Sequence, residues 1–290
     1  MNVLKIGIPK GSLENSTVEL FKKAGWRITY DNRSYFPDID DPEISCSLVR
    51  AQEMSRYVED GHLDMGLTGI DWIMENYSNV VAVQDLIYSK VSTRKARWVL
   101  VVRDDSPLKS IEDMEGKRIS TELVNFTKKY FADRKINVHI EFSWGATEAK
   151  VVEGLVDAVV EVTETGSTIR ANKLRIIHEL MKTNTQLIAN QVAWNDPWKR
   201  KKIEQIRTLL MGSLLAMGKV GLKMNVSKEN LGRVMLLLPS LKAPTVSNLY
   251  SDEWFALETI ADAGIVRDLI PVLLEAGAQG IIEYPLNKVI

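Results

Sequence analysis

One stretch of the sequence, residues 157–168 (DAVVEVTETGST), limits the possible folds more than any other. Its first half, residues 157–162, is apolar and rich in β-branched side chains, which predicts a buried strand. Its second half, residues 163–168, gathers hydroxyl groups and a glycine ahead of a helix-compatible segment at residues 169–174. Such a turn aims backbone N–H groups and hydroxyls at one point. The stretch therefore predicts an α/β unit that can hold a phosphate.

Two carboxylates, those of Glu161 and Glu164, lie in or beside this turn. A carboxylate does not suit a phosphate, but it suits ribose hydroxyls or a Mg²⁺ ion that bridges to a substrate. The combination favours a sugar phosphate as the ligand. The simpler alternative is that the turn only caps a helix, because Ser, Thr and Gly are ordinary capping residues.

The pattern that leads into this strand occurs twice. In residues 58–64 and again in residues 152–157, Val-Glu ends a helical segment and Gly-x-x-Asp opens a buried strand. Two lobes of similar α/β build, with mostly parallel sheets, are the simplest explanation. Ligands of such sheets bind beyond the carboxyl ends of the strands, so both lobes would face one cleft. This arrangement is similar to that of periplasmic binding proteins (type II).

Composition excludes several classes of function. The single cysteine, Cys46, and three histidines among 290 residues are too few for a disulfide framework or a zinc site. A net charge of −1 gives no overall attraction to nucleic acid. The sequence contains no run of 18 apolar residues, the length that a membrane-spanning helix needs. We expect a cytoplasmic protein with neither nucleic acid nor membrane as a partner, whose chemistry comes from carboxylates, cations and the backbone.

Three basic residues are candidates for binding anions. Lys10 follows a strand at residues 3–8 and precedes a helix, Arg50 ends a strand at residues 44–49, and Arg97 interrupts the apolar strand 96–102. A lysine at a helix entrance can hold an anion, but it can also be an ordinary solvated side chain. Position alone leaves Arg97 as either a cleft residue or a charge at a sheet edge.

The texture of the sequence changes after Met217. Strands are expected at residues 219–226, 245–249, 254–261 and 279–284, and helices at residues 227–238 and 266–275. The order βαββαβ is that of a ferredoxin-like (ACT-like) α+β domain. Because this part has no phosphate turn, we expect it to regulate or to oligomerise rather than to catalyse.

Residues 148–169 carry a resemblance to one enzyme family. Glu148, Gly154, Val159, Thr165, Gly166 and Thr168 match the signature of ATP phosphoribosyltransferases, whereas Val156, Glu161 and Ile169 depart from it. Glu161 stands where the family usually has Asp. The whole chain resembles the long form of these enzymes, which carries its own C-terminal regulatory domain.

The resemblance implies a reaction and its site. In the family, N1 of ATP attacks C1 of phosphoribosyl pyrophosphate and expels pyrophosphate in the presence of Mg²⁺, as the first step of histidine biosynthesis. Catalytic roles would fall to Lys10, Arg97 and Glu161. Substrate contacts would come from Lys10, Gly11, Arg50, Gly69, Asp71, Arg97, Glu161, Glu164, Thr165, Gly166, Ser167 and Thr168. The metal ligands are not assigned.

The resemblance also implies domains and regulation. Residues 1–93 and 183–214 would form lobe I, residues 94–182 lobe II, and residues 215–290 the regulatory domain. The family's long form is inhibited by histidine, which converts active dimers to hexamers. The histidine pocket would include Asn225, Leu241, Thr245, Ile260 and Gly280, with Asn225 where an acid is expected.

Two other functions stay open at this point. A cytoplasmic two-lobed solute-binding or sensor protein would have the same shape without catalysis, although it would not need acids beside a phosphate turn. A catalytically dead regulatory relative would keep the fold, and the Glu161 substitution leaves this possibility open.

Overall fold

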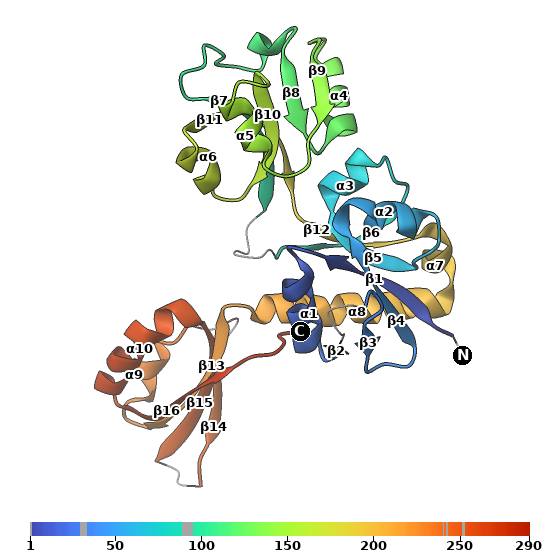
Figure 1. The fold of residues 1–290 in the computed structure, drawn as a ribbon. Coiled ribbons are helices and arrows are strands. Elements are labelled where there is room, and N and C mark those ends of the chain that lie inside the picture. Colours follow the sequence, from blue (N-terminus) through green and yellow to red (C-terminus); the bar gives the residue numbers. More distant parts are fainter. Residues whose placement is uncertain (1, 30–33, 89–94, 240, 242, 251–252) are drawn as a thin grey trace. The chain divides into compact units, whose positions relative to one another are not determined.

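The computed structural model describes residues 2–29, 34–88, 95–239, 241, 243–250 and 253–290 (Figure 1). The chain divides into two compact units. One comprises Met1–Lys22 and Trp26–Arg207, and the other comprises Lys23–Gly25 and Thr208–Ile290. None of the helices in the described part of the chain combines the length and the apolar character that a membrane span requires.

The first unit contains two five-stranded sheets, and each sheet is the centre of one lobe. The sheet of lobe I has the order β4-β1-β5-β12-β6. Its strands are β1 (Leu4–Lys10), β4 (Ile44–Arg50), β5 (Met65–Gly69), β6 (Val81–Leu86) and β12 (Thr185–Ala189). Lobe I also contains α1 (Glu14–Ala24), α2 (Ala51–Glu59), α3 (Ile70–Glu75), α7 (Gln191–Asn195) and the small ribbon of β2 (Ile28–Thr29) and β3 (Asp38–Ile39).

The sheet of lobe II has the order β11-β7-β10-β8-β9. Its strands are β7 (Ala96–Arg103), β8 (Arg118–Thr121), β9 (His139–Phe142), β10 (Ala158–Thr163) and β11 (Leu174–Thr183). The helices of this lobe are α4 (Val124–Ala132), α5 (Thr147–Val152), α6 (Ser167–Ala171) and a 3₁₀ turn, η1 (Glu112–Met114).

The expected two-lobed α/β architecture is confirmed. β1 is parallel to β4 and β5, and β8 is parallel to β9 and β10. Each sheet also contains one antiparallel strand that enters from the other lobe: β12 between β5 and β6, and β7 between β10 and β11. This exchange of strands ties the two lobes together at two crossings of the chain.

Alternate residues of β7 face two different cores. Leu100 is fully buried in a core that includes Phe126 of α4. Val101, the next residue, is fully buried in a core that includes Ile169 of α6. A strand covered on both faces is apolar throughout, which explains the continuous run at residues 98–102. Truncation of Leu100 to alanine would cost about 2–5 kcal/mol of stability.

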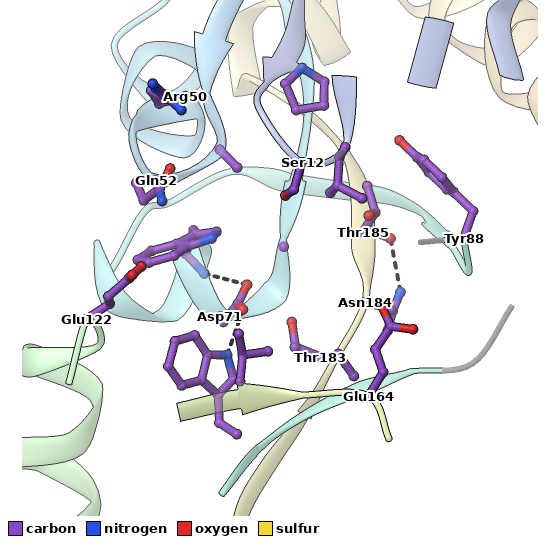
Figure 2. Close-up of a pocket in the computed structure, with 18 of the residues that line it drawn as sticks. Ser12, Arg50, Gln52, Asp71, Tyr88, Glu122, Glu164, Thr183, Asn184 and Thr185 are labelled. Carbon is purple, nitrogen blue, oxygen red and sulfur yellow. Dashed lines mark hydrogen bonds between the residues drawn. The ribbon is translucent and has the colours of Figure 1, made fainter. Parts of the chain in front are cut away.

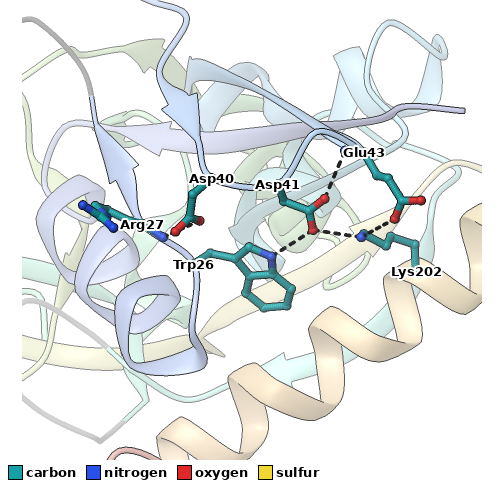
Figure 3. A network of polar contacts seen from close by, with 6 residues as sticks. All are labelled: Trp26, Arg27, Asp40, Asp41, Glu43 and Lys202. Carbon is teal, nitrogen blue, oxygen red and sulfur yellow. Dashed lines mark hydrogen bonds and ion pairs between the residues drawn. The ribbon is translucent and has the colours of Figure 1, made fainter. Parts of the chain in front are cut away.

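Helix α8 (Pro197–Ala216) is attached to lobe I by its basic residues. The ammonium group of Lys202, which is 9% exposed, lies 2.8 Å from Asp41 and 2.7 Å from Glu43 (Figure 3). Trp26 donates its indole N–H to the same Asp41, and Lys199 pairs with Asp64 at 2.7 Å. The run at residues 199–202 predicts a solvated charged surface, which is wrong for these two lysines. They lie three residues apart, and therefore on one side of the helix.

The second unit has the order βαββαβ. Its elements are β13 (Lys219–Ser227), α9 (Leu231–Met235), β14 (Thr245–Asn248), β15 (Trp254–Asp262), α10 (Ala263–Glu275) and β16 (Ala278–Pro285). The sheet order β14-β15-β13-β16, antiparallel throughout, is that of a ferredoxin-like domain and confirms the expected fold. Both helices pack on one face of this sheet in a common core.

Candidate functional site

A cavity of about 380 Å³ lies at the carboxyl ends of the strands of lobe I and is completed by residues of lobe II (Figure 2). Lobe I contributes Lys10, Arg50, Gln52, Gly69 and Asp71, among others. Lobe II contributes Trp98, Glu122, Val162 and Glu164. The position is the one at which parallel α/β sheets bind ligands.

Two cations enter this cavity from neighbouring strands. Lys10 and Arg50 are partners in the parallel pairing of β1 with β4, so their side chains leave the sheet at the same end. The Lys10 ammonium lies 3.9 Å from the centre of the Tyr35 ring. Gly11 has a φ of +114°, and a Cβ atom there would lie 3.2 Å from a guanidinium nitrogen of Arg50. These two cations and the nearby Gly11 backbone are the groups of this cavity that could hold an anion.

The turn after β5 places a carboxylate inside the cavity. Gly69 is the N-cap of α3, and a Cβ atom at this position would collide with the carboxylate of Asp71. Asp71 is 5% exposed and accepts hydrogen bonds from its own neighbour, the Trp72 N–H, and from the indole of Trp98. Burial raises the pKa of Asp71 despite these hydrogen bonds.

Glu122, which the motifs did not single out, lies directly after β8 and lines the cavity from lobe II. Burial raises its pKa, with a further contribution from the charge of Asp71. The Gly145 backbone and the side chain of Gln52, which lies in lobe I, partly offset this rise of the pKa. The rule that ligands meet strand carboxyl ends could have identified Glu122, since it directly follows a strand of the predicted second lobe.

The turn at residues 163–168 forms the start of the short helix α6. Gly166 is its N-cap with a φ of +72°, and the Gly166 N–H donates to the hydroxyl of Thr163 at 2.8 Å. The hydroxyls of Thr165 and Ser167 contact each other at 3.0 Å. Thr165, Ser167 and Thr168 are all exposed, so their hydroxyls can reach a ligand.

Glu161 occupies the opposite face of β10 from Val162 and Glu164. It pairs with Val99, on the face of the sheet that packs against α5 and α6. Its Oε2 atom is buried and has no hydrogen-bond partner. Burial, together with the charges of Glu148 and Glu122, raises the pKa of Glu161 to about 7. A buried oxygen without a donor is uncommon in folded proteins. A ligand hydroxyl or a cation could supply the missing partner.

Comparisons with known proteins identify the family. The profile described as ATP phosphoribosyltransferase matches residues 50–212, and the profile "HisG, C-terminal domain" matches residues 216–288. The ATP phosphoribosyltransferase of Desulfosudis oleivorans is 64% identical over 288 residues, which cover 99% of both chains. The chain belongs to the ATP phosphoribosyltransferase family.

Two further comparisons agree. ATP phosphoribosyltransferase 1 of Geobacter sulfurreducens is 59% identical over 99% of both chains. The solved ATP phosphoribosyl transferase (HisG:HisZ) complex from Thermotoga maritima has a TM-score of 0.62 at 27% identity, and the match covers 72% of this chain and 96% of that chain. The predicted enzyme class, a pentosyltransferase of histidine biosynthesis in its long form with a C-terminal domain, is confirmed. The interpretation as a solute-binding protein without catalysis is set aside.

The predicted site residues of this ATP phosphoribosyltransferase fall into two groups. Those that line the cavity are Lys10, Arg50, Gly69, Asp71 and Glu164. Those outside its lining are Gly11, Arg97, Glu161, Thr165, Gly166, Ser167 and Thr168. Arg97 lies on the face of β7 opposite Trp98 and pairs with Glu179 at 3.2 Å. Its catalytic role, like the other residue roles, stays a prediction.

Most of the predicted histidine pocket lies on one face of the second unit. By strand alternation, Asn225, Thr245 and Ile260 point away from the helices, on the open face of the sheet. Gly280 adjoins Asn225, because a Cβ atom there would lie 3.9 Å from the Asn225 amide nitrogen. Leu241 is 55% exposed in the connection before β14. Its place beside the other four residues stays a prediction.

Proposed function

We propose that ATP and phosphoribosyl pyrophosphate bind on the two sides of the carboxyl end of β10. The observation that carries this proposal is the alternation of Glu161 and Glu164. Glu164 faces the cavity that holds Lys10 and Arg50, whereas Glu161 faces the side of the sheet that leads to the phosphate turn. A nucleotide in the cavity and a sugar phosphate on the turn would meet at this strand end.

The nucleotide side has the charge that a triphosphate needs. Lys10 and Arg50 bind phosphate oxygens, and the Gly69–Asp71 turn positions the base. On the other side, residues 165–168 hold the 5-phosphate, and Glu161 accepts hydrogen bonds from ribose hydroxyls. N1 of adenine then forms the new bond to C1 as the bond from C1 to pyrophosphate breaks. Fixed cations stabilise the negative charge that develops on the departing pyrophosphate. Carboxylates stabilise the positive charge that develops on the ribose ring.

The residues present fit a Mg²⁺ ion that arrives with the substrate. Among the described residues, no three His, Cys, Asp or Glu side chains are grouped as a metal site. Mg²⁺ is usually held by one or two carboxylates together with substrate phosphates. Glu161 provides one such carboxylate, with a buried Oε2 atom that has no partner. Glu148 and Glu122, whose charges raise its pKa, are the nearby carboxylates. A bound Mg²⁺ ion would neutralise charge on the pyrophosphate group.

Histidine, the end product of the pathway, is the proposed ligand of the C-terminal unit. Within the described residues of this unit, both helices pack on the face of the sheet opposite Asn225 and Thr245. The strand order leaves β14 and β16 as edge strands. Edge strands pair readily between subunits, which supports an assembly change from dimers to hexamers. We propose a cytoplasmic location, in keeping with a biosynthetic enzyme family.

The test uses the purified full-length chain with ATP, phosphoribosyl pyrophosphate and Mg²⁺. We expect phosphoribosyl-ATP to form without a second protein. Arg50→Gln should raise the KM for ATP at least tenfold, because a charged contact to phosphate is lost. Arg56→Gln removes an exposed cation of the same lobe, 56% exposed and paired with Glu53, and should change nothing. Activity that requires an added subunit, or equal effects of the two variants, would overturn the proposal.

A further inference from the structure

Helix α3 carries two buried carboxylates one turn apart, and both receive hydrogen bonds from lobe II. Asp71 accepts from the indole of Trp98 at 2.7 Å. Glu75, which is 8% exposed, accepts the backbone N–H groups of Asn125 at 3.0 Å and Phe126 at 2.9 Å. These two N–H groups belong to the first turn of α4, so a side chain of lobe I caps a helix of lobe II.

Asn125 is also held by lobe I in two other ways. Its side-chain amide donates to the backbone carbonyl of Glu75 at 3.1 Å, and its own carbonyl accepts from the hydroxyl of Tyr77 at 3.3 Å. Tyr77 has a φ of +52°, which is uncommon for a residue with a side chain. Several contacts from one end of α3 thus converge on a single residue of α4.

The capped end of α4 adjoins the substrate cavity. Glu122 stands two residues before the first residue of α4 and lines the cavity. Gln52 of lobe I lines the same cavity and interacts with the Glu122 carboxylate. A shift of the start of α4 away from α3 would therefore move Glu122 away from Gln52 and widen the cavity.

We propose that Glu75 is a positioning residue, which fixes the width of the substrate cleft by capping helix α4 across the boundary between the lobes. The role of the cleft rests on the proposed function, but the cap itself rests only on the hydrogen bonds. The N-terminal N–H groups of a helix have no partner within the helix, and a carboxylate satisfies them and complements the helix dipole. If the cleft opened, the hydrogen bonds between Glu75 and these N–H groups would break, and both partners would bind water instead.

The structure offers a matched control. Glu115 accepts the backbone N–H of Asn137 at 2.8 Å, with both residues in lobe II. Glu115→Gln therefore alters a bond between a carboxylate and a backbone N–H without affecting the contact between the lobes. Glu75→Gln keeps one acceptor oxygen, and Glu75→Ala keeps none, so the two changes form a graded series.

The experiment measures the distance between the lobes directly. Spin labels are placed at Lys22→Cys in lobe I and Asp105→Cys in lobe II, two exposed positions, after the native thiol is removed by Cys46→Ser. Without substrate, pulsed electron paramagnetic resonance should show one narrow distance distribution for the parent protein. Glu75→Ala should broaden it toward longer distances, Glu75→Gln should do so less, and Glu115→Gln should leave it unchanged.

Kinetics of the unlabelled variants provide the second measurement. We expect Glu75→Ala to raise the KM for both substrates about tenfold and to lower kcat less at saturation. Unchanged distances and KM values in Glu75→Ala would overturn the proposal, and so would an equal effect of Glu115→Gln. If Glu75→Ala does not fold, Glu75→Gln decides the outcome. If Glu75→Ala broadens the distance distribution but the parent protein has no transferase activity, the role of Glu75 as a cap is supported and the proposed function is rejected.

Discussion

The carboxylate of Asp71 in lobe I accepts a hydrogen bond of 2.7 Å from the indole nitrogen of Trp98 in lobe II, within the wall of the cavity at the strand ends. Burial raises the pKa of this carboxyl group, so the hydrogen bond stabilises a charge that its surroundings disfavour. Asp71, which is predicted to contact the nucleotide, therefore also links the two lobes through a hydrogen bond.

Replacement of Trp98 by Phe should destabilise the protein by about 1–3 kcal/mol, because a buried carboxylate loses a donor. Folded Asp71 ionises only above its raised pKa, so the penalty is largest at high pH and shrinks as the pH falls through that raised value toward 3.8. Urea unfolding at pH 7 and at pH 4 measures both effects. Trp72→Phe is the control, since Asp71 keeps its bond to the Trp72 backbone. Equal losses of stability in the two variants would contradict the prediction.

Replacement of Gly11 by Ala should raise the KM for ATP about tenfold, because the added methyl group lies 3.2 Å from the Arg50 guanidinium and displaces it. Gly61→Ala places a side chain at a similarly positive φ of +75° with no atom within 4 Å. Both variants should lose stability through backbone strain, and only Gly11→Ala should alter nucleotide kinetics. An unchanged KM for ATP in Gly11→Ala would contradict the prediction that Arg50 contacts the phosphates.

The sequence predicted the elements whose patterns are local. The buried strand β10, its turn at Gly166 and the βαββαβ order all follow from apolar runs and turn residues that are close together in the chain. The antiparallel insertion of β7 and β12 did not follow, because strand neighbours are chosen by contacts between distant segments. The same reason explains the error at Lys202, whose partners lie about 160 residues away.

The candidate site shows the same limit. Position at a strand end predicted Lys10 and Arg50, whereas the family resemblance predicted Gly69 and Asp71. All four line the cavity. Strand alternation decides which face a residue occupies, and a shift of one residue reverses it. Arg97 and Trp98 illustrate this point, since the aromatic residue lines the cavity and the arginine does not. Glu75 had no local signal, because its partners are in another lobe.

Replacement of Glu161 by Gln should have opposite effects on stability and activity. The pKa of Glu161 is raised to about 7 from 4.5, so the folded protein resists its ionisation, and stability is lost as the pH rises from 4.5 through 7. At pH 8 the variant should be more stable by an amount on the order of 3 kcal/mol, and at pH 4.5 nearly unchanged. Its kcat/KM for phosphoribosyl pyrophosphate should fall at least tenfold. Thermal melts and initial rates at both pH values test this, and unaltered rates would move the ribose contact to Glu164.

Replacement of Thr168 by Ala should weaken the binding of phosphoribosyl pyrophosphate by about 1–3 kcal/mol, since a hydroxyl donor to the 5-phosphate is lost. Thr168 is exposed, so the melting temperature should stay within about 1 °C, in keeping with the small effects of surface changes. Thr168→Ser retains the hydroxyl and should restore most of the affinity. Isothermal calorimetry measures these differences. If Thr168→Ala binds as the parent does, the turn serves only to start α6.

Replacement of Asn225 by Asp should strengthen inhibition by histidine. Asn225 lies exposed on the open face of the C-terminal sheet, next to Gly280 and on the same face as Thr245. The amino group of histidine is positively charged, and a hydrogen bond between charged groups exceeds a neutral one by about 1–2 kcal/mol. Calorimetry should therefore show affinity for histidine roughly tenfold higher in Asn225→Asp, and sedimentation should show conversion to the larger assembly at a lower histidine concentration. Lys228→Gln, an exposed position in the turn before α9, makes the net charge more negative by one as Asn225→Asp does and serves as the control for net charge, and truncation near Met217 should abolish the response. Absence of histidine binding at millimolar concentration in both the parent and Asn225→Asp would leave the C-terminal unit with a role in assembly alone.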